Sequence, residues 1–254
     1  MKRTFCTLWF LIGTILLTPL ATTKAKAETA RVAVAANFTT AAKNLVQAFE
    51  NTTDHKIKLS FGSTGKIYAQ ISHGAPFDAF LSADSARPAQ LIQQGLAEPS
   101  TQFTYAKGRL ALYSRVLPIT DVDISELLQG SDIEKIAIAN PKTAPYGVAT
   151  IEVLNAYQVH DALKNKIVMG DSISQTFQFT YSKNVSVGFV SASQLIGRTQ
   201  GYSQLLPVNT YQPIHQDAVL LTRSQNNPAA LAFLEFLKSD TAKHLIRRFG
   251  YTID

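Results

Sequence analysis

The sequence predicts an α/β protein of two lobes, and three observations support this. Short apolar segments typical of buried strands alternate with segments whose apolar residues recur at helical spacing. This alternation occurs in two sets, over residues 31–95 and residues 133–191. The chain then ends on one more strand-like segment and two helical segments. Because alternating strands and helices form right-handed crossover units, we expect mainly parallel sheets.

The first set contains three predicted strands, each followed by a predicted helix. The strands are RVAVAA (31–36), IKLSF (57–61) and FDAFLSA (77–83). After the first strand, Ala41, Leu45 and Phe49 lie on one face of a helix. The second helix ends near Gly74, and the third stops at Gly95.

The second set follows RLALYS (109–114) and has the same organisation. Its predicted strands are IEKIAIAN (133–140), NKIVMG (165–170) and VSVGFVS (185–191), with helices over 147–157 and near 175–181. A last strand, DAVLLTR (217–223), precedes the two closing helices. Asn227 before Pro228 starts the first of these, and Ser239 or Asp240 caps the second before Gly250.

Two connecting strands, at 107–114 and 216–223, would carry the chain between the lobes. The first lobe is then discontinuous and consists of residues 28–106 plus 219–254, while the second spans residues 107–218. In open α/β sheets, ligands bind beyond the carboxyl ends of the strands. We therefore expect a ligand in the cleft between the lobes.

The N-terminus reads as a cleaved secretory signal over residues 1–27. Two basic residues precede the apolar run FCTLWFLIGTILLTPLA, and Ala25-Lys26-Ala27 follows as a cleavage site. The alternative, an uncleaved membrane anchor, is disfavoured by the short apolar run. The mature chain would start at Glu28 and be periplasmic.

Cleavage would change the charge of the chain. The full sequence has 24 basic and 18 acidic residues, a net +6. Removing Lys2, Arg3, Lys24 and Lys26 leaves 20 against 18, a net +2, so a nucleic-acid partner is not expected. Cys6, the one cysteine in the sequence, would be lost as well, so the mature protein would form no disulfide.

Four predicted strand ends carry similar chemistry. Small hydroxyl or amide side chains and helix N-termini follow the strands at Asn37, at Gly62-Ser63-Thr64-Gly65, at 141–147 and at 171–174. The second end resembles a phosphate-binding loop, but Ser60 and Ile67 stand where that motif needs Gly and Ser or Thr. Each end could merely cap a helix. Together they favour an anion held between the lobes.

The sequence gives little evidence of a catalytic site. The five histidines are scattered, without the spacing of metal ligands, and the sequence contains no G-x-S-x-G elbow. We therefore predict no enzyme activity, no catalytic residue, no protein-bound metal ion and no cofactor.

The chain resembles the periplasmic molybdate-binding proteins, which have the type II periplasmic binding protein fold. The motifs that carry the resemblance are VAVAANFTTAAKNL, SFGSTGKIYAQI, GAPFDAFLSAD, NPKTAPYG, GDSISQ, GFVSASQ and the ending FLEFLKSDTAKHLIRRFGYTI. They span the whole predicted mature chain.

The resemblance implies a monomeric receptor that captures molybdate, and also tungstate, and delivers it to the membrane permease of an ABC importer. The implied contacts with the oxyanion are Ala36, Asn37, Ser63, Tyr146 and Ile173. They are contacts with oxygen atoms rather than direct ligands of the metal. Some members bind with a tyrosine where this chain has Ser191, whereas others use the tyrosine of the APYG motif, which is present here.

The chemistry of the strand ends agrees with this. Molybdate is a fully deprotonated dianion that needs hydrogen-bond donors, and Lys66 is expected to point outward while Asp171 caps its own helix. Two alternatives stay open. One is a receptor for sulfate or another oxyanion, and the other is a secreted hydrolase that uses Ser63 or Ser172.

Overall fold

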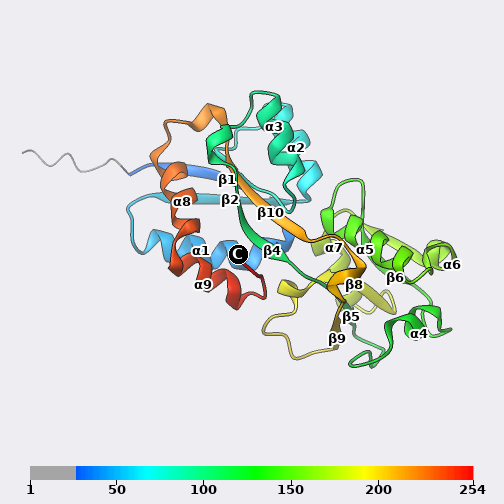
Figure 1. The fold of residues 1–254 in the computed structure, drawn as a ribbon. Coiled ribbons are helices and arrows are strands. Elements are labelled where there is room, and N and C mark those ends of the chain that lie inside the picture. Colours follow the sequence, from blue (N-terminus) through cyan, green and yellow to red (C-terminus); the bar gives the residue numbers. More distant parts are fainter. Residues whose placement is uncertain (1–26, 254) are drawn as a thin grey trace, which may run out of the picture.

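The computed structural model describes residues 27–253 and has two lobes, each built on a five-stranded sheet (Figure 1). The first sheet has the order β2-β1-β3-β10-β4. Its strands are β1 (Thr29–Ala35), β2 (Lys56–Gly62), β3 (Ala79–Leu81), β4 (Phe103–Gly108) and β10 (Ile214–Leu220). The helices of this lobe are α1 (Thr39–Glu50), α2 (Thr64–Ser72), α3 (Ala86–Gln93), α8 (Pro228–Lys238) and α9 (Asp240–Arg248).

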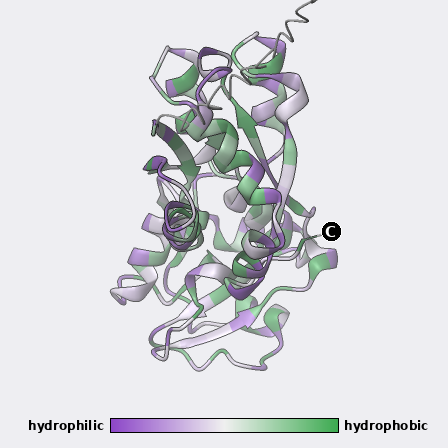
Figure 2. Ribbon diagram, turned by 90° about the vertical axis from the view of Figure 1, so that its left-hand side faces the viewer, coloured by the Kyte–Doolittle hydropathy of each residue, from purple (hydrophilic) through white to green (hydrophobic). Residues whose placement is uncertain are grey.

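The second sheet has the order β7-β6-β8-β5-β9. Its strands are β5 (Leu110–Ser114), β6 (Ile136–Ala139), β7 (Ile167–Gly170), β8 (Val187–Ser191) and β9 (Tyr202–Leu205). The helices of this lobe are α4 (Ile124–Gln129), α5 (Pro145–Ala156), α6 (His160–Leu163) and α7 (Ile173–Tyr181). In both lobes, apolar residues lie along the strands and on the helices that cover them (Figure 2).

Both sheets are mixed, whereas the sequence predicted mainly parallel ones. β1 runs parallel to β2 and β3, and β6 runs parallel to β7 and β8, as the crossover units require. β10 is antiparallel to β3 and β4, and β5 is antiparallel to β8 and β9. The antiparallel pairings arise because β10 and β5 belong to the segments that carry the chain between the lobes (Figure 1).

The predicted elements mostly form as their patterns indicated. Helix α1 buries the apolar face that contains Ala41, Leu45 and Phe49. The Asn227 side chain caps α8 by accepting from Ala229 N–H, and the Ser239 side chain caps α9. Strands β4 and β9 and helices α4 and α6 were not predicted as separate elements.

The connection predicted as one strand at 107–114 is two strands in different sheets. β4 ends at Gly108 and β5 begins at Leu110, so the chain changes sheet at Arg109. The proposed lobe boundaries after residues 106 and 218 fall inside β4 and β10, and they stay a prediction. Over residues 27–253, no helix has both the length and the apolar character to cross a membrane. The predicted signal lies almost entirely outside the described residues.

Candidate functional site

A small cavity lies between the lobes, at the carboxyl ends of their strands. Its lining consists of Ala35, Ala36, Asn37, Ser63, Thr64, Ala83, Ala144, Pro145, Tyr146 and Ile173. All five residues predicted as oxyanion contacts are among them. The volume is about 10 Å³, close to the room that one water molecule takes. The lobes therefore have to separate before any solute can enter.

Ser63 presents a buried hydroxyl group to this cavity. It occupies the N-cap position of α2, yet its side chain makes no capping hydrogen bond. The residue is 3% exposed, and within residues 27–253 its Oγ has no hydrogen-bond partner. Because an unpaired buried hydroxyl is costly, such a group usually has a partner that the protein itself does not supply. Helix capping therefore does not explain why a serine occupies position 63.

Asn37 lies in the short 3₁₀ helix η1 (Ala36–Phe38) that follows β1. Its side-chain amide is bound by other residues of the protein. The Nδ2 atom donates to Gln216 Oε1 at 2.8 Å and to the Tyr251 hydroxyl at 3.0 Å. Both amide hydrogens thus bind protein groups, and the donors that η1 can offer are backbone N–H groups at its start.

Tyr146 enters the site from the second residue of α5 and is fully buried. Its hydroxyl oxygen accepts from Ser191 Oγ at 3.0 Å and from Gln216 Nε2 at 3.3 Å. Burial raises the pKa of this hydroxyl well above its usual value, so the group stays protonated at neutral pH. Since its oxygen is the acceptor in both hydrogen bonds, the proton of the Tyr146 hydroxyl remains available for donation to a ligand.

Ile173 is the first residue of α7 and contributes a backbone donor. The Ser172 side chain caps the helix by accepting from Gln175 N–H at 3.3 Å. The N–H of Ile173 has no acceptor within the helix, because the first turn of any α-helix leaves its N–H groups unpaired. The helix dipole also favours an anion at this end.

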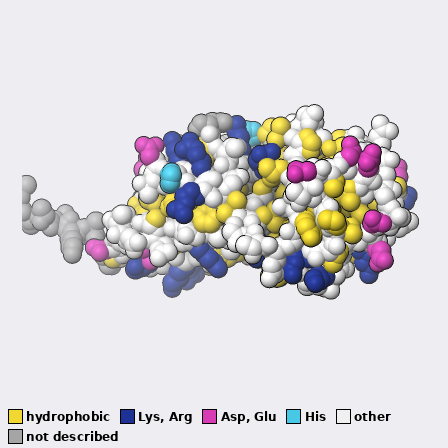
Figure 3. All heavy atoms as spheres, turned by 90° about the horizontal axis from the view of Figure 1, so that it is seen from below, with side chains coloured by type: hydrophobic (Ala, Val, Ile, Leu, Met, Phe, Trp, Pro, Cys, Tyr) yellow, Lys and Arg dark blue, Asp and Glu magenta, His cyan; other side chains and the backbone are white. Residues whose placement is uncertain are grey.

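Two charged residues near the site, Lys66 and Asp171, pair with each other outside the cavity. Lys66 Nζ is exposed and lies 2.7 Å from Asp171 Oδ2, which joins α2 to the start of α7. The prediction that Asp171 caps its own helix is wrong, because Ser172 takes the capping position. None of the ten lining residues has a charged side chain. In the view from below, charged side chains are spread over both lobes (Figure 3).

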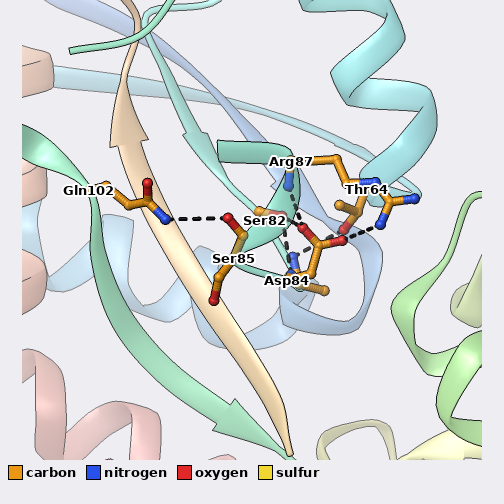
Figure 4. A network of polar contacts seen from close by, with 7 residues as sticks. Thr64, Ser82, Asp84, Ser85, Arg87 and Gln102 are labelled. Atoms are coloured by element: carbon orange, nitrogen blue, oxygen red, sulfur yellow. Dashed lines mark hydrogen bonds and ion pairs between the residues drawn. The ribbon is translucent and has the colours of Figure 1, made fainter. Parts of the chain in front are cut away.

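A carboxylate lies next to the lining residue Ala83, but it is neutralised. Asp84 accepts from the Arg87 side chain at 2.8 Å and from Arg87 N–H at 2.9 Å (Figure 4). Thr64, in the same view, accepts at its Oγ1 from Ala83 N–H at 3.0 Å. The pairing limits the repulsion that Asp84 would exert on an anion in the cavity.

The lobes touch directly beside the cavity. Gly65 N–H donates to the Thr143 carbonyl at 2.8 Å, and Ser174 Oγ donates to the Ala36 carbonyl at 3.2 Å. A Cβ atom on Gly65 would lie 2.9 Å from Thr143 Cα. Glycine at this position therefore allows the two backbones to approach.

Comparison with known proteins assigns the family. The model of the family described as bacterial extracellular solute-binding protein matches residues 30–252. The chain belongs to this family. This agrees with the resemblance seen in the sequence motifs.

Within the solute-binding family, two relatives are both described as the molybdate-binding protein ModA. That of Rhodobacter capsulatus is 45% identical over 222 residues, which cover 87% of each chain. That of Azotobacter vinelandii is 43% identical over 89% of this chain and 91% of the relative. A solved structure of the periplasmic molybdate-binding protein of Azotobacter vinelandii superposes with a TM-score of 0.84 at 35% identity, covering 89% of this chain and 99% of that one. The type II binding-protein fold is thereby confirmed.

Sequence reasoning missed most of the residues that support the site from behind in this solute-binding protein, and it considered Ser191 only as a direct contact of the ligand. Gln216, Ser191, Ser193, Tyr105 and Tyr251 form a buried hydrogen-bonded network around Asn37 and Tyr146. Gln216 lies between His215 and Asp217 in β10, so nothing in the local sequence set it apart from its polar neighbours. Tyr251 stood in the closing FGYTI motif, but nothing local linked that motif to the cleft.

Proposed function

We propose that the protein is an extracytoplasmic receptor that captures molybdate, and tungstate with the same donors, and delivers it to the membrane permease of an ABC importer. The observation that carries the proposal is the cavity between the lobes, whose lining offers hydrogen-bond donors and no charged side chain. The molybdate-binding relatives, alike over almost the whole chain, support the same ligand.

In this proposal the oxyanion is held by neutral donors from both lobes. The first lobe offers the backbone of Ala36 and Asn37 and the Ser63 hydroxyl. The second lobe offers the Tyr146 hydroxyl and the Ile173 N–H. A fully deprotonated dianion matches such a set, because each of its oxygens accepts hydrogen bonds and none donates one. Closure of the lobes would exclude water and strengthen these bonds.

Calorimetric titration with molybdate, tungstate, sulfate and phosphate tests the ligand. We expect tight binding of molybdate and tungstate and weaker binding of sulfate, whose shorter bonds would leave some donors out of reach. Phosphate, protonated near neutral pH, should bind weakest because no carboxylate in the lining accepts its proton. Equal affinities for sulfate and molybdate would remove the molybdate assignment in favour of a general oxyanion receptor.

We also propose that the protein acts in the periplasm as a monomer after loss of residues 1–27, and that it is not an enzyme. The absence of a hydrogen-bond partner for Ser63 Oγ among residues 27–253 speaks against a serine nucleophile, which needs a base in contact. Ser172 is engaged in capping α7. An assay with ester and phosphate substrates tests this: turnover that Ser63→Ala abolishes would contradict the receptor function.

A further inference from the structure

The backbone carbonyl of Asn37 is held from both lobes at once. It accepts from Ser193 Oγ at 2.9 Å and from the Tyr251 hydroxyl at 2.9 Å. The Tyr251 hydroxyl also lies 2.9 Å from Ser193 Oγ. All three residues are buried, with 8% exposure or less. We call Asn37, Ser193 and Tyr251 the clasp.

Tyr251 is fixed firmly to the first lobe. It follows α9, and its ring meets Phe38 edge to face with the centroids 5.1 Å apart. The next residue, Thr252, exchanges two backbone hydrogen bonds with Lys107 of β4, at 2.8 and 3.1 Å. The tyrosine is therefore held before it reaches across the cleft.

Ser193 is fixed equally well to the second lobe. It lies in the 3₁₀ helix η4 (Ala192–Gln194) directly after β8. Ser191 and Gln194 form a reciprocal capping box around this short helix. Ser193 Oγ therefore reaches Asn37 and Tyr251 only when the lobes are together.

The clasp also determines the orientation of the Asn37 side chain and backbone at the cavity. The Tyr251 hydroxyl accepts from Asn37 Nδ2 while it approaches the carbonyl of the same residue. Side chain and backbone of Asn37 are thus fixed together, and the planar peptide fixes the direction of the following N–H. Burial raises the pKa of the Tyr251 hydroxyl, so it remains a donor at neutral pH.

We propose that Tyr251 is a positioning residue of the oxyanion site, which together with Ser193 holds the lobes closed over the ligand and slows its release. The proposal rests on the proposed function, because it concerns the same cavity. The hydrogen bond from Ser193 Oγ to the Asn37 carbonyl and the contact of Ser193 Oγ with the Tyr251 hydroxyl both cross from one lobe to the other, so both must break before the ligand can leave.

Tyr251→Phe tests the proposal, because it removes the hydroxyl and keeps the ring against Phe38. We expect radiolabelled molybdate to dissociate about three- to tenfold faster, with little change in the association rate, because, of the contacts that the variant removes, only the one with Ser193 crosses between the lobes. Tyr113→Phe is the matched control. Its hydroxyl donates to the Gln200 carbonyl at 2.8 Å within the second lobe, so this variant should lower the melting temperature but not speed release.

Ser193→Ala removes the hydroxyl that the second lobe contributes to the clasp. It provides a second test if Tyr251→Phe folds poorly. We expect Ser193→Ala to increase the dissociation rate by a similar factor. In the double variant the increase should be smaller than the product of the two single increases, because the two hydroxyl groups act as a unit. Wild-type release rates in Tyr251→Phe and Ser193→Ala would overturn the clasp alone. Failure of the wild-type protein to bind any of the four oxyanions would overturn the proposed function and this inference with it.

Discussion

Gly65→Ala separates the closure of the lobes from the stability of the fold. The new Cβ would lie 2.9 Å from Thr143 Cα and 3.0 Å from the Thr143 carbonyl oxygen. Carbon atoms in contact normally keep about 3.5–4.0 Å apart, so the overlap with Thr143 Cα amounts to about 0.6–1.1 Å. Both neighbours are backbone atoms of the opposite lobe, and relief therefore requires the lobes to move apart. The hydrogen bond from Gly65 to Thr143 would then be stretched.

The expected effects on folding and binding have opposite signs. Gly65 is the second residue of α2, and alanine is favoured over glycine in a helix by up to about 1 kcal/mol, so the melting temperature without ligand should stay level or rise. Overpacking at a well-fitted contact costs about 1–3 kcal/mol, which corresponds to a loss of molybdate affinity of roughly 5- to 150-fold.

Calorimetry and thermal unfolding of the same preparation measure both effects. Lys66→Ala, at the next position of the same helix, is the control: it removes only the exposed ion pair with Asp171 and should change affinity less than about threefold. Wild-type affinity in Gly65→Ala would refute the reasoning that the lobes close to the distance seen in the structure.

Three further predictions concern how the anion is held. Ser63→Ala should weaken molybdate binding by about tenfold to a hundredfold in calorimetry without lowering the melting temperature, since it removes a hydroxyl that no described group satisfies. Lys142→Ala should change affinity less than about threefold, because the residue is exposed; abolished binding would instead indicate an ion pair with the anion. Affinity should stay level from about pH 7 to 9, since the raised pKa keeps Tyr146 protonated there. The pKa of Tyr146 is higher in the folded than in the unfolded protein, so the folded state holds the proton more tightly. The contribution of Tyr146 to the free energy of unfolding is therefore fully present below about pH 10 and is lost as the pH rises further.

Sequence alone determined the elements whose signals are local. The apolar spacing of α1, the caps at Asn227 and Ser239, and the runs of buried residues in β1 and β6 could be recognised because neighbours in the chain dictate them. The candidate site followed in the same way. Asn37, Ser63, Tyr146 and Ile173 lie in the segments that follow strand ends, and the carboxyl ends of parallel strands meet at one edge of a sheet.

Only the tertiary structure decided what these side chains do. It shows that the amide of Asn37 donates to Gln216 and Tyr251, about 180 and 214 residues away in the chain. It also decided that Asp171 pairs with Lys66 across the cleft instead of capping its helix. The reason is that a polar side chain can satisfy its hydrogen bonds with many partners, and which one it meets depends on how distant segments pack. Apolar periodicity survives in a single segment, whereas a contact between lobes exists only when both are folded and brought together.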